Sequence, residues 1–470
     1  MTLRRAQFGR WSRMAGIMAV TAGFTVLGLK VAGADFSPLA NSPDYAQFMH
    51  IYDLISQNYV RPVDSRTLLT GAEDGLVRAL GDPFSVYMNP LMAARFRELV
   101  NSEFQGIGAV LNQSAGDLSI SSVLPGSPAA RAGLQPGDEL VKIGGQSVAN
   151  MSLEQAVERI RGKLGTSVDL VIRRAGHTQS VRVARARLTQ STVFARMLPE
   201  QIGYIQITQF SEGTAKAFAR DLQILKENQM RGLIVDVRDD PGGLLSSVGR
   251  VADDLLPKGG SILQVVGRDG ERQVLRASGP GLSLPMVCLI DGNSASAAEI
   301  LAAALNESAH VPLVGEKSYG KGTVQETEEF ADGSSLKLTV ARWLTPDGQW
   351  IHKVGLAPNV RVPTPAWSNL PMLSVSDTRP LQEGSNSLSV AVLQRILLAV
   401  GLDPGRSDGY FSAQTRAAVT AFQGLHRLPT TGTVNSATAY SLNVALLSQQ
   451  RRNDPQLTAA VGLLEARLMR

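Results

Sequence analysis

The chain has 470 residues, which is long enough for about three domains with well-developed cores. Its composition, 44% hydrophobic and 19% charged, argues against wholesale disorder. The net charge is +5, but residues 1–30 hold five basic residues and no acid, which leaves 41 basic and 41 acidic residues in the rest of the chain. A neutral protein lacks the field of a nucleic-acid-binding surface, so we expect no nucleic-acid partner.

Cys288 is the only cysteine, and it lies inside an apolar run. An intrachain disulfide and a cysteine metal site are therefore excluded. A single buried thiol is most often part of the core. The five histidines include no pair at metal-ligand spacing, so we expect neither a metal ion nor a cofactor.

Residues 1–34 have the pattern of an export signal. Four arginines precede Met14–Leu29, which is uncharged and mostly apolar, and Ala32-Gly-Ala34 follows as a small-residue cleavage site. The apolar run is slightly short for a spanning helix, yet residues 14–29 kept as a membrane anchor remain an alternative. We expect an exported protein of the bacterial cell envelope that meets the membrane only through this segment.

Residues 35–102 read as a helical amino-terminal segment. Apolar residues recur at helical spacing between Tyr45 and Val100, and Asp82-Pro83 interrupts the pattern. No catalytic constellation is visible here. We interpret the segment as a packing or oligomerisation element, which includes the formation of a homodimer.

Residues 103–188 form a β-rich segment with an ordered series of Gly/Pro turns. It opens with Phe104–Val110 and continues with Pro125-Gly, Pro136-Gly-Asp and Ile143-Gly-Gly, before a helix at Leu153–Arg161 and a strand at Ser167–Arg173. This pattern resembles a bacterial PDZ domain. The resemblance implies that Gly106, Ile107 and Gly108 form the loop that captures the terminal carboxylate of an extended peptide. The alternative is a glycine-rich hairpin without a ligand.

The stretch from Asp291 to Glu299 follows a short apolar run, Pro285–Ile290, and opens a helix. A serine at a helix start lies beside unpaired N–H groups and a partial positive charge, which stabilise an oxyanion. Ser296-x-x-Glu299 also fits a capping box, so this stretch alone leaves a nucleophile and a helix cap both open.

Strands and helices alternate from Ile202 onward, which predicts an α/β core over residues 189–362. A glycine turn, Arg238–Gly243, follows one buried strand. Lys321 lies between two glycines, so it can pack against another backbone and lose its hydration. Burial lowers the pKa of a lysine towards neutrality, as a general base requires, although a solvated turn lysine is the simpler alternative.

Three motifs occur in order after the PDZ-like segment: Asp-x-Arg-x-x-Pro-Gly-Gly, Ser-Ala-Ser-Ala-x-Glu and Gly-Lys-Gly-x-x-Gln. Together they resemble the carboxy-terminal processing, or tail-specific, serine proteases over roughly residues 40–362. The resemblance implies peptide-bond hydrolysis of protein substrates with accessible C-termini. It assigns the catalytic roles by position: Ser296 as nucleophile, Lys321 as general base and Gln325 as the residue that positions the lysine.

The same resemblance implies an oxyanion hole made by the backbone N–H of Ala297 and of a glycine in the turn. Gly242 and Gly243 both remain candidates, with a slight preference for Gly243. Asp240 departs from the usual pattern, which has asparagine before Pro241. Two other functions stay open: a non-catalytic PDZ and cell-wall scaffold, and a Ser-His-Asp hydrolase, for which His310 is the histidine nearest to Ser296 in sequence.

A stretch rich in Pro, Ser, Asn and Asp, residues 363–385, reads as a linker. Residues 386–445 then resemble the small three-helix peptidoglycan-binding domain, which implies peptidoglycan as a partner, and residues 446–470 form a helical tail. The predicted fold is therefore a multidomain α+β protein. Its parts are a helical amino-terminal segment, a PDZ-like β domain, an α/β serine protease core and a small three-helix C-terminal domain.

Overall fold

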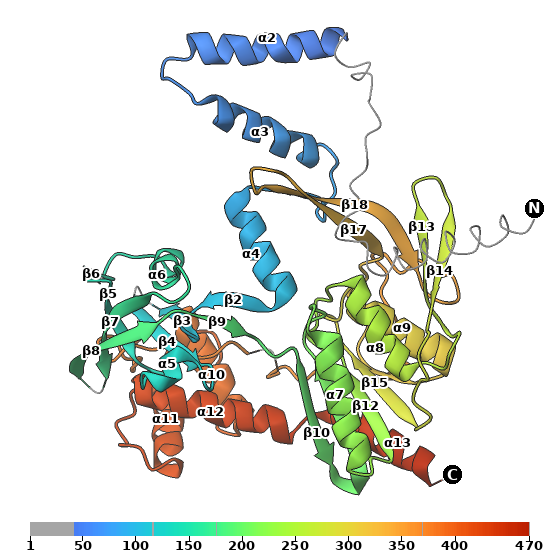
Figure 1. Ribbon diagram of the computed structural model, residues 1–470. Coiled ribbons are helices and arrows are strands. Elements are labelled where there is room, and N and C mark those ends of the chain that lie inside the picture. Colours follow the sequence, from blue (N-terminus) through green and yellow to red (C-terminus); the bar gives the residue numbers. More distant parts are fainter. Residues whose placement is uncertain (1–41, 115–116, 175, 369, 470) are drawn as a thin grey trace, which may run out of the picture. The chain divides into compact units, whose positions relative to one another are not determined.

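The computed structural model describes residues 42–114, 117–174, 176–368 and 370–469 (Figure 1). The predicted export signal and the alternative anchor at residues 14–29 lie outside these residues. The described chain divides into two compact units, and each is interrupted in sequence. The first contains the chain up to Asn101 with Thr192–Leu313 and Lys317–Asn359, and the second contains Ser102–Ser191, Val314–Glu316 and Val360–Arg470.

The described part of the first unit begins with three helices, α2 (Pro43–Asn58), α3 (Ser65–Arg78) and α4 (Pro90–Asn101). Side chains cap the starts of α2 and α3, where Ser42 and Asp64 accept hydrogen bonds from the first turn. Neither α2 nor α3 contains a buried residue, so their apolar side chains are exposed or only partly covered.

The core of the first unit is the predicted α/β layer. Its strands are β10 (Val193–Leu198), β11 (Ile202–Ile207), β12 (Gly232–Asp236) and β15 (Met286–Ile290), paired in that order. β11, β12 and β15 run parallel, and β10 is antiparallel to β11. Every residue of β12 and β15 is buried, in keeping with the continuous apolar runs of their sequences.

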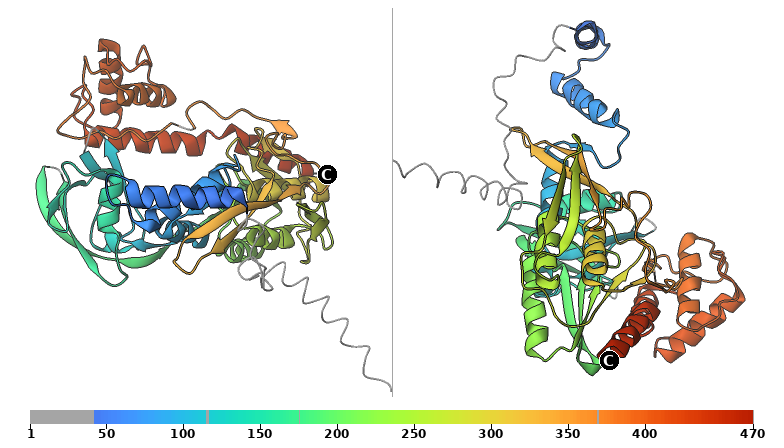
Figure 2. Two further views of the ribbon diagram at one scale, coloured as in Figure 1. Left: turned by 90° about the horizontal axis from the view of Figure 1, so that it is seen from above. Right: turned by 90° about the vertical axis from the view of Figure 1, so that its right-hand side faces the viewer.

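Three helices pack with this sheet: α7 (Thr214–Glu227), α8 (Leu245–Leu255) and α9 (Ala297–Ala309). Figure 2 shows them alongside the strands from two further directions. Their buried residues join the strands in one large hydrophobic cluster that includes Phe210, Phe218 and Trp343. α9 follows β15 after a short turn, which confirms the predicted strand, turn and helix around Ser296.

A second sheet of the first unit is antiparallel, and the sequence did not predict it. Its members are β1 (Val86–Met88), β13 (Ser261–Gly267), β14 (Arg272–Arg276), β17 (Thr323–Glu329) and β18 (Ser335–Leu344). β18 pairs with β1, β13 and β17. Because β17 begins two residues after Lys321, this sheet carries both the lysine loop and Gln325.

The second unit contains the PDZ domain. Its larger sheet is formed by β3 (Ala109–Ser114), β4 (Asp117–Val123), β5 (Glu139–Ile143), β7 (Ser167–Arg174) and β8 (His177–Ala184), with β6 (Gln146–Ser147) paired to β5. A separate pair is β2 (Glu103–Gly106) with β9 (Ala186–Thr189). α5 (Pro128–Arg131) and α6 (Leu153–Ile160) complete the domain. α6 and β7 confirm the helix and the strand that the sequence predicted here.

The rest of the second unit is mostly helical: α10 (Leu388–Ala399), α11 (Ala413–Leu425), α12 (Ser436–Arg452) and α13 (Pro455–Leu468). The strand pair β16 (Leu313–Gly315) and β19 (Val360–Arg361) precedes the helices. The segment predicted as a linker packs on them. Leu373 is buried and exchanges two backbone hydrogen bonds of 2.8 Å with the side chain of Asn443. Apolar side chains of this segment also join the hydrophobic cluster of the helices, among them Leu373, Val375 and Leu381.

Candidate active site

Ser296 lies at the N-terminus of α9 in a rare backbone conformation. Its φ is 55° and its ψ is −112°, values that non-glycine residues seldom adopt. The turn before it is fixed by Ser294, whose buried Oγ donates to the carbonyl of Val237 at 2.7 Å and accepts from the N–H of Asp291 at 2.9 Å. These bonds engage the hydroxyl of Ser294 in fixing the turn.

Glu299 connects the serine turn to the lysine loop. Its side chain is 0% exposed, and one oxygen, Oε2, accepts from the N–H groups of Ser296 at 2.9 Å and of Lys321 at 2.8 Å. The other oxygen accepts from the N–H of Gly320 at 2.7 Å and from the hydroxyl of Ser318 at 2.5 Å. A buried carboxylate is tolerated because four donors surround it. The capping-box pattern found the first of these bonds, but the contacts to the lysine loop could not be predicted.

The two glycines beside Lys321 are required by close packing. A Cβ on Gly320 would lie 2.8 Å from the backbone nitrogen of Gly355, and a Cβ on Gly322 would lie 2.8 Å from Nε1 of Trp350. Any other residue would therefore displace the loop. This arrangement agrees with the expected packing of the lysine loop against another backbone.

Lys321 itself is half-buried. Burial lowers the pKa of its ammonium group, and the positive charge of Lys337 lowers this pKa further. The negative charges of Asp82 and Glu299 act in the opposite direction. A lysine with a lowered pKa can be neutral closer to physiological pH, which is the form that accepts a proton.

Indole N–H groups hold the backbone carbonyls of this lysine and of the residue after it. Trp343 donates to the carbonyl of Lys321 and Trp350 donates to the carbonyl of Gly322, each at 2.8 Å. His352 stacks on Trp350 with ring centroids 5.3 Å apart, and its Nδ1 accepts from the N–H of Gly322 at 3.3 Å. The lysine loop is thus fixed at its backbone, whereas its side chain remains available for chemistry.

Gln325 lies on β17, close in sequence to the lysine loop. Its Nε2 donates to the hydroxyls of Thr323 at 2.9 Å and Thr339 at 3.1 Å. These two bonds fix the orientation of the amide. His310, in contrast, is the C-cap of α9, at the opposite end of that helix from Ser296. A helix of 13 residues spans about 20 Å, so His310 cannot serve as the base of a Ser-His-Asp site.

The glycine turn lies against the serine turn. A Cβ on Gly242 would lie 2.6 Å from the carbonyl oxygen of Ala295 and 2.8 Å from the nitrogen of Ala297, so the two turns are in direct contact. The N–H of Gly242 already donates to Oδ1 of Asp240 at 2.8 Å. Gly243, in contrast, is exposed. Ala297 is the first residue of α9, so its N–H has no acceptor within the helix. The geometry therefore favours Gly243 over Gly242 as the candidate that would join Ala297 as the second N–H donor of an oxyanion hole.

The predicted carboxylate loop of the PDZ domain, Gly106, Ile107 and Gly108, leads into β3, and all three residues are buried. β3 is the end strand of its sheet and pairs only with β4. Gly108 has a φ of 83°, and a Cβ there would lie 2.2 Å from Cβ of Ser127, so only glycine fits. An end strand that follows a glycine loop has an edge to which a peptide strand can be added.

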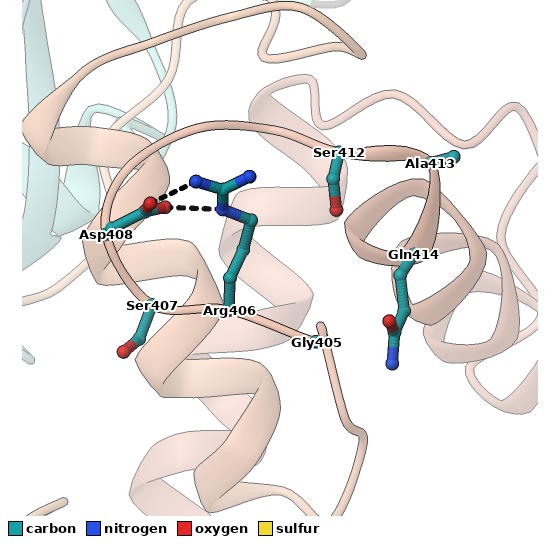
Figure 3. A pocket seen from close by; sticks show the side chains of 7 residues that line it. All are labelled: Gly405, Arg406, Ser407, Asp408, Ser412, Ala413 and Gln414. Carbon is teal, nitrogen blue, oxygen red and sulfur yellow. Dashed lines mark hydrogen bonds and ion pairs between the residues drawn. The ribbon is translucent and has the colours of Figure 1, made fainter.

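The C-terminal helices carry a separate open hollow of about 730 Å³ (Figure 3). It lies between the loop before α11 and the first turn of that helix, and Arg406, Asp408 and Gln414 are among its lining residues. Arg406 forms an ion pair with Asp408, and its hydrogen bond lowers the pKa of this exposed carboxyl to about 2. The hollow is therefore lined by polar and charged groups of both signs.

Within the described ranges, no three His, Cys, Asp or Glu side chains cluster in a way that could hold a metal ion. In the same part of the chain, no helix combines the length and the apolar character that a membrane span needs.

The α/β core, the strained serine and the buried lysine loop, in one chain with a PDZ domain, define a serine protease of several domains. Comparison with known proteins agrees, because the profile of peptidase family S41 matches residues 201–362. Other profiles match a PDZ domain at 119–174, a peptidoglycan binding domain at 386–442 and the N-terminal domain of the activating protease CtpB at 31–90.

The chain belongs to peptidase family S41, among the carboxy-terminal processing proteases. It is 40% identical over 421 residues to the carboxy-terminal processing protease CtpB of Bacillus subtilis (strain 168), covering 88% of this chain and 87% of that protein. The identity to CtpA of the same organism is 36% over 448 residues, or 95% and 94% of the two chains. A similar solved structure is the photosystem II D1 C-terminal processing protease, with 26% identity, coverage of 68% and 94%, and a TM-score of 0.42.

Proposed function

We propose that this protease cleaves peptide bonds with a Ser296–Lys321 dyad assisted by Gln325. The observation that carries the proposal is the position of Glu299 Oε2, which accepts from the backbone N–H groups of both Ser296 and Lys321. Two nitrogens that donate hydrogen bonds to one oxygen lie closer together than the sum of the two donor–acceptor distances. The nucleophile and the base therefore start from neighbouring backbone positions.

In the proposed reaction, the neutral amine of Lys321 accepts the hydroxyl proton of Ser296 as Oγ attacks the substrate carbonyl carbon. The backbone N–H groups of Ala297 and Gly243 stabilise the oxyanion. The lysine then donates its proton to the leaving amine, and water hydrolyses the acyl-enzyme. Gln325 positions the lysine through its amide oxygen, because both threonine bonds use its nitrogen.

The test compares Ser296→Ala, Lys321→Ala and His310→Ala on an unstructured peptide. The first two variants should lose cleavage, by a factor of about 10³ or more, and keep their far-ultraviolet circular dichroism. His310→Ala should retain it. Since only the neutral amine accepts a proton, wild-type activity should rise with pH through the lowered pKa of Lys321. Full activity in Ser296→Ala or Lys321→Ala would refute the dyad, and an inactive wild type would favour the scaffold alternative.

The PDZ domain is proposed to select substrates by their C-termini. The buried glycine loop at 106–108 and the end strand β3 support capture of a terminal carboxylate by Gly106, Ile107 and Gly108. A substrate with an amidated C-terminus should be cleaved with a lower kcat/KM than the same peptide with a free carboxylate. Equal rates for the two peptides would refute this mode of selection.

We further propose an exported enzyme of the cell envelope that binds peptidoglycan through residues 386–445. The match to a peptidoglycan binding domain and the polar hollow beside α11 support this partner. Full-length protein should pellet with isolated peptidoglycan, and deletion of residues 386–470 should abolish pelleting. Undiminished pelleting of the truncated protein would contradict the proposal. Whether residues 14–29 are cleaved or kept as an anchor can be read from the N-terminus of the mature protein.

A homodimer through the amino-terminal segment, residues 35–102, is also proposed. On α2, Phe48, Ile51 and Leu54 are 45%, 48% and 48% exposed and recur at helical spacing. A second copy presents the same apolar stripe, as a two-fold interface requires. Sedimentation should show a dimer that Phe48→Asp converts to a monomer, whereas Asp53→Lys, on the opposite face of the helix, should remain dimeric. The proposed limits of the other segments are 103–188 for the PDZ domain, 189–362 for the protease core, 363–385 for the linker and 446–470 for the helical tail.

A further inference from the structure

The short turn that joins the amino-terminal helices to β1 is held against the antiparallel sheet of the core. Oδ1 of Asp82 accepts from the N–H of Phe84 at 3.0 Å, and Oδ2 accepts from the hydroxyl of Ser85 at 2.6 Å. β1 then pairs with β18, so that Val86 lies opposite Lys337. A segment whose sequence indicated only packing is therefore bonded to the sheet that carries Gln325.

A continuous series of hydrogen bonds leads from this turn to Gln325. The buried hydroxyl oxygen of Ser85 accepts from the N–H of Thr339 at 3.0 Å. The hydroxyl of Thr339 in turn accepts from Nε2 of Gln325 at 3.1 Å. The orientation of the glutamine amide thus depends on the position of the turn.

The same turn contacts the side chain of Lys321. Nζ of Lys321 lies 5.0 Å from the ring centroid of Phe84, within the range of a cation–π interaction. The ring of Phe84 also meets His352 edge to face, with centroids 6.2 Å apart. Phe84 therefore forms one wall of the space that the lysine side chain occupies.

Charged groups surround Lys321 from three elements besides its own loop. Lys337 on β18 contributes a positive charge, whereas Asp82 in the turn and Glu299 on α9 contribute negative charges. His352, which contacts Phe84, is a further titratable side chain beside the loop. Lys337 is half-buried, and its Nζ lies 5.4 Å from the ring centroid of Phe96 on α4. The amino-terminal segment thus contacts both lysines.

We propose that the turn Asp82–Ser85 is a positioning element of the active site. Phe84 walls the side chain of Lys321, Ser85 fixes Gln325 through Thr339, and the opposite charges of Asp82 and Lys337 set the electrostatic environment of the base. This inference rests on the proposed role of Lys321 as base. It assigns the amino-terminal segment a positioning role, because displacement of that segment would disturb the base and the glutamine together.

The test uses two substitutions that remove charges of opposite sign. Asp82→Asn removes a negative charge and lowers the pKa of Lys321, so the acid limb of the kcat/KM profile should move to lower pH. Lys337→Met removes a positive charge and raises this pKa, so the limb should move to higher pH. Each shift should be at least about 0.5 pH unit, because these charges act on Lys321 in a partly buried site.

Asp53→Asn on α2 and Lys216→Met on α7 are matched controls, because both residues are exposed and lie outside this cluster. Neither should move the profile. Opposite shifts in the two test variants support the proposal, since a merely structural defect lowers the rate without moving the limb in opposite directions. If Asp82→Asn does not fold, Phe84→Leu takes its place. It removes the ring that faces Nζ of Lys321 and favours the ammonium form, so the acid limb should again move to lower pH.

Absence of a shift in Asp82→Asn, or shifts of both variants in the same direction, would overturn the inference. These outcomes remain distinct from failure of the proposed function, which is decided by Lys321→Ala. If Lys321→Ala is inactive and the two charge variants leave the profile unchanged, the dyad stands and the positioning role of the turn is refuted.

Discussion

Asp240 is a buried acidic residue of the glycine turn. Its side chain is 0% exposed, and Oδ1 accepts from the N–H of Gly242, whereas the buried Oδ2 has no hydrogen-bond partner within the described residues. Burial raises the pKa of Asp240 to about 8, and the negative charges of Asp236 and Asp291 contribute to the rise. We predict that Asp240→Asn stabilises the protein increasingly as the pH rises from 5 to 7.

The sign follows from proton linkage. The carboxyl of the unfolded chain has an ordinary pKa near 3.8, so between about pH 4 and pH 8 the folded protein binds one proton more than the unfolded chain. Its free energy of unfolding therefore falls by about 1.4 kcal/mol per pH unit from this group. Asparagine binds no proton in either state, so the advantage of the variant should grow by about 2.7 kcal/mol between pH 5 and pH 7.

The measurement is urea unfolding at pH 5, 6, 7 and 8, with both proteins in a Ser296→Ala background to prevent self-cleavage. Tryptophan fluorescence monitors the transition, because Trp343 is 1% exposed in the core cluster. Asp240→Ala is the control: it should show the same pH dependence as Asp240→Asn but lower stability throughout, since it also loses the bond to Gly242. A constant difference between wild type and Asp240→Asn at all pH values would show that Asp240 is ionised in the fold and refute the reasoning.

Three further predictions concern the site and the core. Glu299→Gln replaces an acceptor of four hydrogen bonds, so it should lower the free energy of unfolding by about 3 kcal/mol and remove most of the activity. The control is Glu307 on the same helix, which accepts from the N–H of Asp347. Glu307→Gln should cost less than about 1 kcal/mol by urea unfolding. Gly322→Ala should reduce kcat about tenfold or more, because its Cβ meets Trp350. Gly249→Ala should leave kcat unchanged, because the nearest atom to its Cβ lies at 3.7 Å. An unchanged kcat in Gly322→Ala would mean that the lysine loop adapts freely. Cys288 is fully buried and burial raises the pKa of its thiol, so a thiol reagent should modify it only on unfolding, and rapid labelling of folded protein would contradict its place in the core.

The departure from the family pattern at Asp240 is explained by the raised pKa of its carboxyl. Asp240 stands where asparagine is usual, and a protonated carboxyl resembles an amide in shape and in lack of charge. Its Oδ1 still accepts from the N–H of Gly242, as an asparagine oxygen would. The substitution therefore preserves the glycine turn near neutral pH and makes it sensitive to alkaline conditions.

The amino-acid sequence by itself determined the local parts of this protein. The apolar runs at β12 and β15, the glycines beside Lys321 and the serine at the start of α9 follow from short-range rules of burial, backbone freedom and helix termination. Three such motifs in order were sufficient to identify the family. Their chemistry could be read because each one occupies only a few consecutive residues.

Only the tertiary structure decided which distant groups surround them. Antiparallel pairing of β18 with β1 joins Thr339 to Ser85, 254 residues apart, and no local pattern encodes that register. Glu299 was predictable as part of a helix cap, but not as the acceptor that holds Lys321 across 22 residues. Hydrogen bonds and charges act through space, so the partners of a catalytic lysine depend on how the chain returns to it.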